Sequence, residues 1–381
     1  MLNPPKYAEF FCGGGMVRAA LKSQWDCALA NDIDRMKAHV YEANWGKDGL
    51  VVSDVCDIPD GILRQPIDLY WASSPCQDFS LAGKGRGLNG QRSGVFRSWI
   101  QKITPAVQDG FAPSIIAFEN VSGLISRRNG QDFEEVLRSL IDLGYNVGAL
   151  EIDARHYVPQ SRPRLFVIAL HKSVAPMSLC DARPTSVYHT KRLRSFIATA
   201  PRRIKQSWCW WRIDLPTRRV PELQSLIEVD TGLEWLSPAE VDRLVSLMSD
   251  PSRHRLEAAQ QSGRIEIGTL YKRGRPDAHG RTRQRAEIRF DGLAGCLRTP
   301  SGGSSRQTLV VVEGAAVKAR LLSSREAVRL MGLADSYVIP DNYNSAYKVA
   351  GDGVVVPLVR HLDAAIFQPA LKIAQKSSKA A

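Results

Sequence analysis

Short apolar runs alternate with helix-like patterns along the first part of the chain. The helix-like patterns predict helices at Met16–Ser23 and Arg35–Ala43. The apolar runs predict strands at Tyr7–Cys12, Asp26–Asn31, Leu50–Val52, Leu69–Ala72, Ile115–Glu119 and Leu165–Leu170. Strand–helix alternation at this spacing indicates an α/β fold, with a mostly parallel sheet and helices on both of its faces.

The pattern changes after His171. From there to about Arg285 the regular alternation stops, while arginine, lysine, proline and tryptophan become common. This change predicts a second, smaller domain, which we place at residues 172–319. The tryptophans Trp208, Trp210 and Trp211 suit either base stacking or a small hydrophobic core.

Apolar periodicity returns at Ser324–Met331, and Val349–Ile366 ends in a helix-like pattern. We therefore expect residues 320–381 to pack back on residues 1–171 and to complete the first domain. The small domain is then an insertion in the larger one.

The composition is that of an ordinary soluble globular protein, with 44% hydrophobic and 24% charged residues among 381. The net charge of +12 favours a polyanionic partner such as nucleic acid. The seven cysteines are scattered without a C-x-x-C pair, which argues against a disulfide framework and a structural zinc site. With no signal peptide and no membrane-length apolar run in the sequence, we expect a reducing, intracellular compartment.

A glycine-rich turn, Phe11-Cys12-Gly13-Gly14-Gly15, directly follows the first predicted strand. Glycines there let the backbone turn tightly and approach a ligand, as they also do in dehydrogenases. Acidic residues follow the next two strands in Asn31-Asp32-Ile33-Asp34 and Ser53-Asp54-Val55. They suit ribose hydroxyl groups in a nucleoside pocket, or equally the first residues of solvated helices.

Three polar stretches lie at the ends of later predicted strands, and each contains a side chain that can take part in a reaction. Ser74-Pro75-Cys76-Gln77 places a cysteine after a strand, with proline fixing the backbone before it. Glu119-Asn120-Val121 and Gln160-Ser161-Arg162-Pro163-Arg164 follow in that order.

With these motifs in this order, the chain resembles the DNA (cytosine-5)-methyltransferases of bacteria and phages. The matching stretches are Phe11–Gly15, Pro75–Gln77, Glu119–Val121, Gln160–Arg164 and, more loosely, Tyr347–Pro357. The resemblance implies a Rossmann-like, mixed seven-stranded sheet of the S-adenosylmethionine-dependent type, with an inserted target-recognition domain. It implies methyl transfer from S-adenosylmethionine to carbon 5 of a flipped-out cytosine in a specific duplex DNA sequence.

Carbon 5 of cytosine is a poor nucleophile, so the ring must first be attacked at carbon 6. A thiolate suits this step because it is strongly nucleophilic and also leaves readily. The resemblance makes Cys76 this nucleophile and Glu119 the carboxyl group that stabilises charge at ring nitrogen 3. Arg164 would orient Glu119 and contact the base carbonyl, with Arg162 supporting the same pocket. Taken singly, Glu119 also suits a surface salt bridge and the arginines suit ordinary charge before a strand.

The resemblance also assigns residues to the cofactor and to DNA. The cofactor residues are Phe11, Gly13, Gly15, Asp32, Ile33, Asp54, Val55, Pro75, Asp352 and Val354. The DNA-binding residues are Gln77, Ser80, Lys84, Arg86, Arg92, Ser93, Thr269, Arg273 and Arg275. In the family the stretch Leu81–Gly94, which contains Lys84, Arg86, Arg92 and Ser93, is a mobile loop that closes over the flipped base, for which a merely flexible surface loop is the alternative. The basic runs of the small domain suit phosphate binding, or else a solvated surface.

The sequence departs from the family pattern at Gly351-Asp352-Gly353, where the family usually has Gly-Asn. We expect Asp352 still to bind the cofactor, by contacting the amino group of S-adenosylmethionine. The expected partner is double-stranded DNA, with a separate restriction endonuclease optional, and the protein is expected to be monomeric, cytoplasmic and nucleoid-associated. The competing hypotheses are a transfer-RNA cytosine-5 methyltransferase and an inactive DNA-binding homologue.

Overall fold

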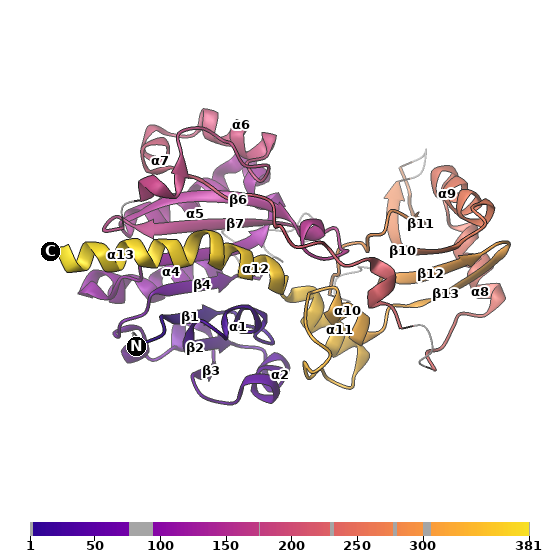
Figure 1. Ribbon diagram of the computed structural model, residues 1–381, viewed down its shortest axis with the longest axis horizontal. Helices are drawn as coiled ribbons and strands as arrows, with labels where there is room; N and C mark the ends of the chain where they lie inside the picture. Colours follow the sequence, from indigo (N-terminus) through magenta and orange to yellow (C-terminus); the bar gives the residue numbers. More distant parts are fainter. Residues whose placement is uncertain are drawn as a thin grey trace. The chain divides into compact units, whose positions relative to one another are not determined.

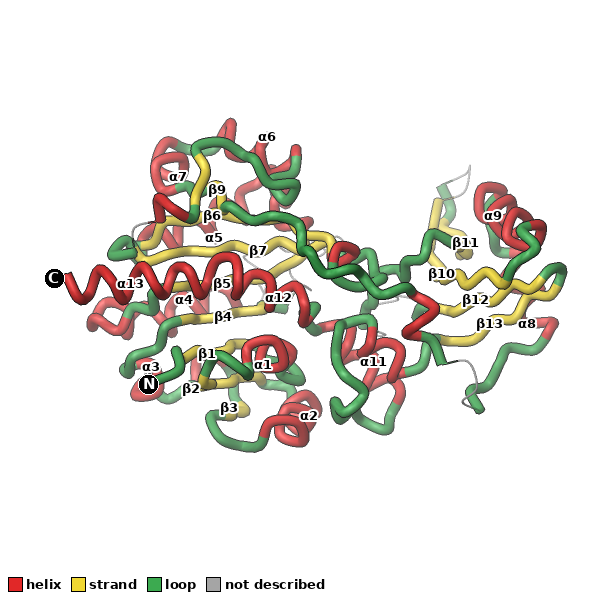
Figure 2. The backbone as a smooth tube through the Cα atoms, viewed as in Figure 1, coloured by secondary structure: helices red, strands yellow, loops and turns green. Residues whose placement is uncertain are grey.

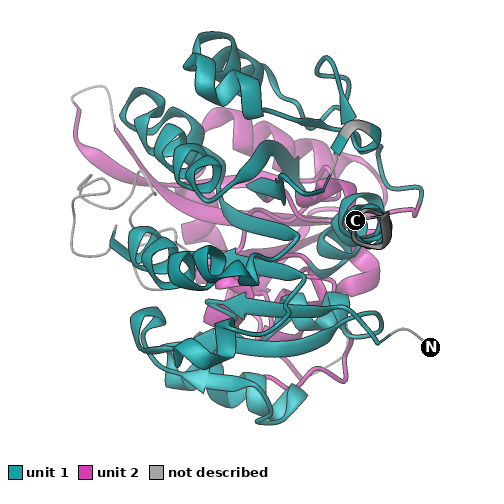
Figure 3. Ribbon diagram, turned by 90° about the vertical axis from the view of Figure 1, so that its left-hand side faces the viewer, with its two compact units in different colours: residues 1–153, 163–217, 356–381 teal, residues 154–162, 218–355 magenta. Residues whose placement is uncertain are grey.

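The computed structural model describes residues 3–75, 94–174, 176–228, 232–276, 280–299 and 306–380. The chain divides into two compact units (Figure 3). The first comprises residues 1–153, 163–217 and 356–381, and the second comprises residues 154–162 and 218–355.

A seven-stranded sheet forms the centre of the first unit (Figure 1). Its strands are β1 (Lys6–Phe10), β2 (Asp26–Asp32), β3 (Leu50–Val52), β4 (Leu69–Ser73), β5 (Ile115–Val121), β6 (Tyr145–Asp153) and β7 (Pro163–His171). The strand order is β3-β2-β1-β4-β5-β7-β6, and β7 runs antiparallel to both of its neighbours. The other neighbouring strands pair in parallel. This mixed sheet confirms the predicted α/β class.

Helices cover both faces of the sheet. Those of the first unit are α1 (Met16–Leu21), α2 (Arg35–Trp45), α3 (Asp60–Leu63), α4 (Gly94–Ala106), α5 (Gln131–Asp142), α6 (Lys191–Thr199), α7 (Arg202–Ser207), α12 (Val356–Leu362) and α13 (Gln368–Ala380). Apolar side chains of α4 and α5, among them Trp99 and Phe133, pack in the core on one face. On the other face the ring of Phe367, between α12 and α13, lies 6.3 Å from that of Trp71. Alternation of side chains along each strand supplies both cores.

Every strand and helix predicted above for the first domain is present, and its ends differ from the prediction by two residues at most. Strand β6 is missing from the prediction. Gly148 in its middle weakens the strand signal. A Cβ at Gly148 would lie 2.1 Å from the carbonyl oxygen of Cys209, so the close approach of that segment requires glycine.

The predicted boundary after residue 171 differs from the division of the structure, which keeps residues 172–217 with the first unit. This segment forms α6, α7 and a short pair of strands, β8 (Cys180–Asp181) and β9 (Trp210–Trp211). It is irregular because it forms a covering layer: Leu193 and Ile204 are buried in the core of the large sheet, and Trp208 packs against it. The core role predicted for the tryptophans as an alternative is therefore the one the structure supports.

The second unit contains a four-stranded antiparallel sheet with the order β11-β10-β12-β13. Its elements are α8 (Pro238–Ser246), α9 (Asp250–Gln261), β10 (Ile265–Pro276), β11 (Thr282–Arg289), β12 (Thr308–Glu313), β13 (Ala316–Leu321), α10 (Ser324–Arg329) and α11 (Tyr343–Asp352). Reciprocal hydrogen bonds between Ser237 and Glu240 begin α8. Residues of α8, α9 and one face of the sheet share a core, which gives this unit its own stability.

The second unit ends later than the prediction, because α10 and α11 belong to it and only residues from 356 onward return to the first unit. The segment Val349–Ile366, predicted to end in a helix-like pattern, contains the end of α11 and the whole of α12 (Figure 2). The run Tyr343–Lys376 is long and apolar enough to span a membrane by length and composition alone. However, 61% of its most apolar window is buried inside the protein, as in the core helices of soluble proteins.

Candidate active site

The turn after β1 holds three residues in the left-handed backbone region: Phe11 (φ 60°), Gly13 (φ 57°) and Gly15 (φ 79°). A bulky residue such as phenylalanine rarely adopts this conformation, and strain of this kind concentrates at ligand sites. A Cβ at Gly13 would meet no atom within 4 Å, whereas one at Gly15 would lie 2.5 Å from Trp45 Nε1. Gly13 therefore borders open space, and Gly15 borders packed aromatic side chains.

Asp32, at the end of β2, holds this turn in place. Its Oδ2 accepts a hydrogen bond from the backbone N–H of Gly13 at 2.8 Å, and its Oδ1 accepts one from Asp34 at 2.8 Å. These bonds compensate for the burial of the carboxylate. Asp34 in turn begins α2 by accepting a hydrogen bond from Met36 N. The helix-start role is thus present at Asp34, and ribose binding by Asp32 stays a prediction.

The remaining predicted cofactor residues of the first unit also follow strands. Ile33 is 66% exposed, which is unusual for a large apolar side chain next to a buried aspartate. Val55 is buried, and Asp54 Oδ1 accepts a hydrogen bond from Cys56 N at 2.9 Å. Because a carboxylate accepts several hydrogen bonds, this helix-start role leaves Asp54 able to bind a ligand as well.

Glu9, just before the glycine turn, was not among the predicted site residues. It is buried in β1, and burial raises the pKa of its carboxyl group well above the ordinary value. The backbone N–H groups of Val17 and Arg18 donate hydrogen bonds to it. Glu9 therefore anchors the start of α1, directly after the glycine turn.

Asn120 joins two strand ends and was also missed as a site residue. It is buried, and its Nδ2 donates hydrogen bonds to Ser74 Oγ at 3.0 Å and to the Ser74 carbonyl at 3.4 Å. Its Oδ1 accepts one from the backbone N–H of Val121. Asn120 thus fixes the chain that leads into Pro75, the last described residue before Cys76.

The side chains of Glu119 and Arg164 lie close together on two neighbouring strands of the large sheet. Strands β5 and β7 are neighbours, and Arg164 is paired with Val121 in their register. Arg164 Nε lies 3.1 Å from Glu119 Oε1, and their side chains are only 14% and 8% exposed. The surface salt bridge considered for Glu119 is therefore excluded, because the pair is largely withdrawn from solvent.

Arg162 contacts a different part of the chain. Its guanidinium donates hydrogen bonds to the carbonyl oxygens of Leu297 (2.9 Å), Gly351 (2.8 Å) and Gly353 (2.7 Å), all within the second unit. Gln160 likewise donates to the Leu330 carbonyl at 2.8 Å. The described contacts make Arg162 a positioning residue for the turn around Asp352, which is exposed.

Thr269, Arg273 and Arg275, predicted to bind DNA, all lie on β10. Thr269 is buried and its hydroxyl group donates to the Leu293 carbonyl at 3.0 Å, which is a structural role. Arg273 and Arg275 are paired with Glu287, at N···O distances of 3.8 Å and 2.8 Å. Val354 is buried in the second unit.

Several predicted residues lie outside the part of the chain that the structure describes. They are Cys76, Gln77, Ser80, Lys84, Arg86, Arg92 and Ser93.

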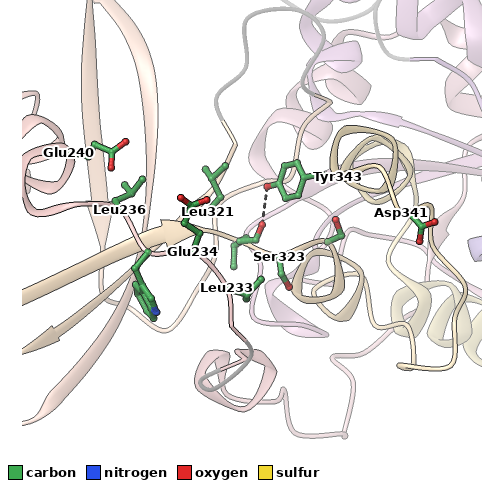
Figure 4. Close-up of a pocket in the computed structure, with 11 residues that line it drawn as sticks. Leu233, Glu234, Leu236, Glu240, Leu321, Ser323, Asp341 and Tyr343 are labelled. Carbon is green, nitrogen blue, oxygen red and sulfur yellow. Dashed lines mark hydrogen bonds between the residues drawn. The ribbon is translucent and has the colours of Figure 1, made fainter.

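A cavity of about 460 Å³ lies in the second unit and holds none of the predicted site residues (Figure 4). Leucines, Trp235 and Tyr343 line it together with three carboxylates. Tyr343 uses its hydroxyl group to donate a hydrogen bond to the Leu322 carbonyl at 2.9 Å. Because no cysteine and no basic side chain is among the residues that line it, the cavity does not suit the predicted chemistry.

Comparison with known proteins decides the family. The model of the family described as C-5 cytosine-specific DNA methylase matches residues 6–368. The chain belongs to this family.

Relatives of this methylase family align along nearly the whole chain. The type II methyltransferase M.HhaI of Haemophilus parahaemolyticus is 25% identical over 360 residues, covering 94% of this chain and 92% of its own. M.HpaII of Haemophilus parainfluenzae is 26% identical over 374 residues, covering 93% and 87%. The family match thus makes the protein a DNA (cytosine-5)-methyltransferase.

Solved structures with the methylase fold agree. The methyltransferase EhMeth of Entamoeba histolytica superimposes with a TM-score of 0.64 at 14% identity, covering 97% of this chain and 99% of its own. The Dnmt2 methyltransferase of S. pombe gives 0.58 at 15% identity, covering 96% and 99%. At this identity the likeness concerns the fold.

Proposed function

We propose that the protein transfers a methyl group from S-adenosylmethionine to carbon 5 of a cytosine flipped out of a specific duplex DNA sequence, through a covalent bond to Cys76. The observation that carries the proposal is the largely buried pair of Glu119 and Arg164, with Nε and Oε1 3.1 Å apart. A carboxyl group held by a guanidinium beside the strand that leads to Cys76 is what activation of a cytosine ring requires.

In this mechanism the Cys76 thiolate forms a bond to carbon 6, and the electron pair of the ring moves toward nitrogen 3. Glu119 donates a hydrogen bond or proton at nitrogen 3, and Arg164 orients Glu119 and contacts the base carbonyl. Carbon 5 thereby becomes nucleophilic. Once carbon 5 carries the methyl group, solvent water accepts the carbon 5 proton, and the electron pair of that C–H bond re-forms the double bond to carbon 6. The bond from carbon 6 to sulfur breaks at the same time, which restores the Cys76 thiolate.

The glycine turn fits the cofactor that the family uses. S-adenosylmethionine, when bound, supplies an electrophilic methyl group on a sulfonium. Open space at Gly13 admits a ligand close to the backbone, and exposed Ile33 offers an apolar contact for a base. Phe11, Gly15, Asp32, Asp54, Val55 and Pro75 would complete the site, with Asp352 and Val354 serving the methionine end.

Access to the target requires the cytosine to leave the base stack, because its reactive atoms are hidden inside a duplex. We assign this step to the segment after Cys76. Its contacts to the opened duplex would come from Gln77, Ser80, Lys84, Arg86, Arg92 and Ser93, with Arg273 and Arg275 contributed by the second unit. Thr269 is left out because it is buried. The enzyme would act as a cytoplasmic, nucleoid-associated monomer, with or without a separate restriction endonuclease.

A duplex with 5-fluorocytosine in mixed sequence tests the mechanism. Fluorine does not leave carbon 5 as a proton does, so the bond to Cys76 persists and survives denaturation. We expect a covalent complex that depends on S-adenosylmethionine, is absent with Cys76→Ala, and remains with the control Cys56→Ala, which changes an exposed cysteine outside the proposed mechanism. A complex formed equally by Cys76→Ala would contradict the assignment.

A further inference from the structure

The cavity of the second unit combines exposed apolar side chains with a volume that suits a small ligand. Trp235 and Leu321 both line it, and they are 37% and 42% exposed. Single exposed apolar residues are common on protein surfaces, but apolar residues that line one cavity together indicate a binding site. The volume of about 460 Å³ lies within the range of roughly 300–1,000 Å³ that is usual for small-molecule sites.

Hydrogen bonds within the second unit hold the walls of this cavity. The backbone N–H of Leu236 donates to the Ala319 carbonyl of β13 at 2.9 Å. The Tyr343 hydroxyl donates to the Leu322 carbonyl at 2.9 Å, as the dashed line in Figure 4 marks. The cavity is therefore formed before a ligand arrives, which lowers the entropic cost of binding.

The charged side chains of the lining are all carboxylates. Glu234 and Glu240 lie on one side of Tyr343 in Figure 4, and Asp341 lies on the other. Glu240 accepts hydrogen bonds from the backbone N–H and the hydroxyl group of Ser237, both at 2.8 Å. Neither Glu234 nor Asp341 forms an ion pair with a residue that the structure describes. The chain as a whole has 51 lysines and arginines against 39 acidic residues, so this cavity departs from the general charge of the protein.

Arg320 lies next to the cavity, but its charge is already neutralised. Its guanidinium is 5.3 Å from the centroid of the Trp235 ring. It also pairs with Glu326 at 2.6 Å, and the two side chains are 1% and 0% exposed. Arg320 therefore positions the tryptophan and leaves the carboxylates of the cavity without a counterion from this side.

We propose that the cavity binds a small organic cation, in which an ammonium or guanidinium group is attached to an apolar body. The apolar body would cover Trp235 and Leu321 and so remove their exposed area from water. The cationic group would face Glu234 and Asp341, which supply the complementary charge. A phosphate would meet three carboxylates and is excluded as the ligand. This inference does not depend on the proposed function.

The competing explanation is a solvated surface hollow, whose carboxylates only keep the protein soluble. It predicts that a cation, a neutral molecule and an anion of similar shape bind equally weakly. Phenethylamine, phenethyl alcohol and 3-phenylpropionate form such a set of probes. They are titrated against the full chain by saturation-transfer NMR, with S-adenosylmethionine in excess so that its own site is filled.

We expect phenethylamine to bind at least about tenfold more tightly than phenethyl alcohol, and 3-phenylpropionate not to bind. Glu234→Gln and Asp341→Asn should each weaken phenethylamine binding about fivefold, the effect of one charge about 4 Å away in water. Trp235→Ala should weaken phenethylamine and phenethyl alcohol alike, because it removes apolar contact and no charge. The control is Glu257→Gln, which removes the same charge from an exposed position on α9, outside the lining.

Thermal unfolding of each variant verifies that the second unit stays folded. Equal affinity for the three probes, unchanged affinity in both Glu234→Gln and Asp341→Asn, or an equal loss in Glu257→Gln would overturn the proposal. A capped Leu-Arg-Leu peptide tests the other source of the same chemistry. Binding of this peptide without binding of phenethylamine would assign the cavity to a segment of another protein and would also overturn the proposal.

Discussion

Asn120 illustrates how a single buried side chain determines the geometry of the site. Its hydrogen bonds to Ser74 fasten the end of β5 to the residue that precedes Pro75 and Cys76. Sequence reasoning could quote this asparagine within a motif but could not assign its partner, since Ser74 is 46 residues away. The contact between Asn120 and Ser74 thus becomes visible only in the structure.

Replacement of Asn120 tests this positioning role. Asn120→Ala leaves the buried Ser74 groups without a donor, which costs about 1–3 kcal/mol of the free energy of unfolding. We expect a lower Tm together with a lower kcat, measured by thermal unfolding and methyl transfer. Ser74→Ala, which removes only the hydroxyl acceptor, should have a smaller effect. Wild-type stability and activity in Asn120→Ala would contradict the role.

Replacement of Glu119 tests the chemical role. Glu119→Gln keeps the shape of the side chain but removes the acid, so kcat should fall about 10²- to 10⁴-fold, the usual contribution of general acid catalysis. DNA affinity should change little. Glu151→Gln is the matched control, because Glu151 is also a buried, arginine-paired glutamate of the same sheet. It should keep the wild-type kcat, and an equal loss in both variants would point to a structural effect.

At the scale of elements, the apolar runs located the strands well because parallel strands buried on both faces are continuously apolar. They failed at β6, where Gly148 admits the Cys209 backbone. They also failed for residues 172–217, which cover the sheet without a regular period of their own. Local patterns therefore predicted the sheet, while layers formed by contacts distant in sequence required the structure.

The two left-handed glycines of the turn after β1 should respond differently to alanine. At Gly15 a Cβ would overlap Trp45 and Tyr41, so Gly15→Ala should lower the Tm strongly. At Gly13 the space is open, and Gly13→Ala carries only the left-handed strain of about 1–2 kcal/mol. We expect Gly13→Ala to stay folded but to lose the rise in Tm that S-adenosylmethionine gives the wild type. An unchanged rise would exclude Gly13 from the cofactor site.

His189, which precedes α6, predicts a pH dependence of stability. It is 3% exposed, and burial lowers the pKa of its ring to about 4 from the ordinary 6.5. Between these values the unfolded chain binds a proton that the folded chain does not, so stability falls as pH falls. The contribution is at most about 3 kcal/mol. In His189→Asn the Tm should depend less on pH in this window, while His39→Asn, at an exposed position, should follow the wild type.

At the scale of the whole molecule, the motif Gln160–Arg164 contributes hydrogen-bonding side chains to each of the two units. Gln160 and Arg162 hold carbonyl groups of the second unit, and Arg164 holds Glu119 of the first. The family resemblance implied one pocket for both arginines, whereas the contacts described for Arg162 and Arg164 are made to different parts of the chain. The structure divides into two compact units whose boundaries differ from those of the predicted domains, since the boundaries of the units depend on which core each segment joins.

The central claim is that Cys76 directs methylation to carbon 5 of cytosine in duplex DNA. The most direct measurement is mass spectrometry of nucleosides after incubating mixed-sequence duplex DNA and transfer RNA, separately, with the protein and methyl-deuterated S-adenosylmethionine. We predict labelled 5-methyldeoxycytidine from DNA with the wild type and none with Cys76→Ala. Label only in transfer RNA, label at another position of the base, or undiminished labelling by Cys76→Ala would contradict the account.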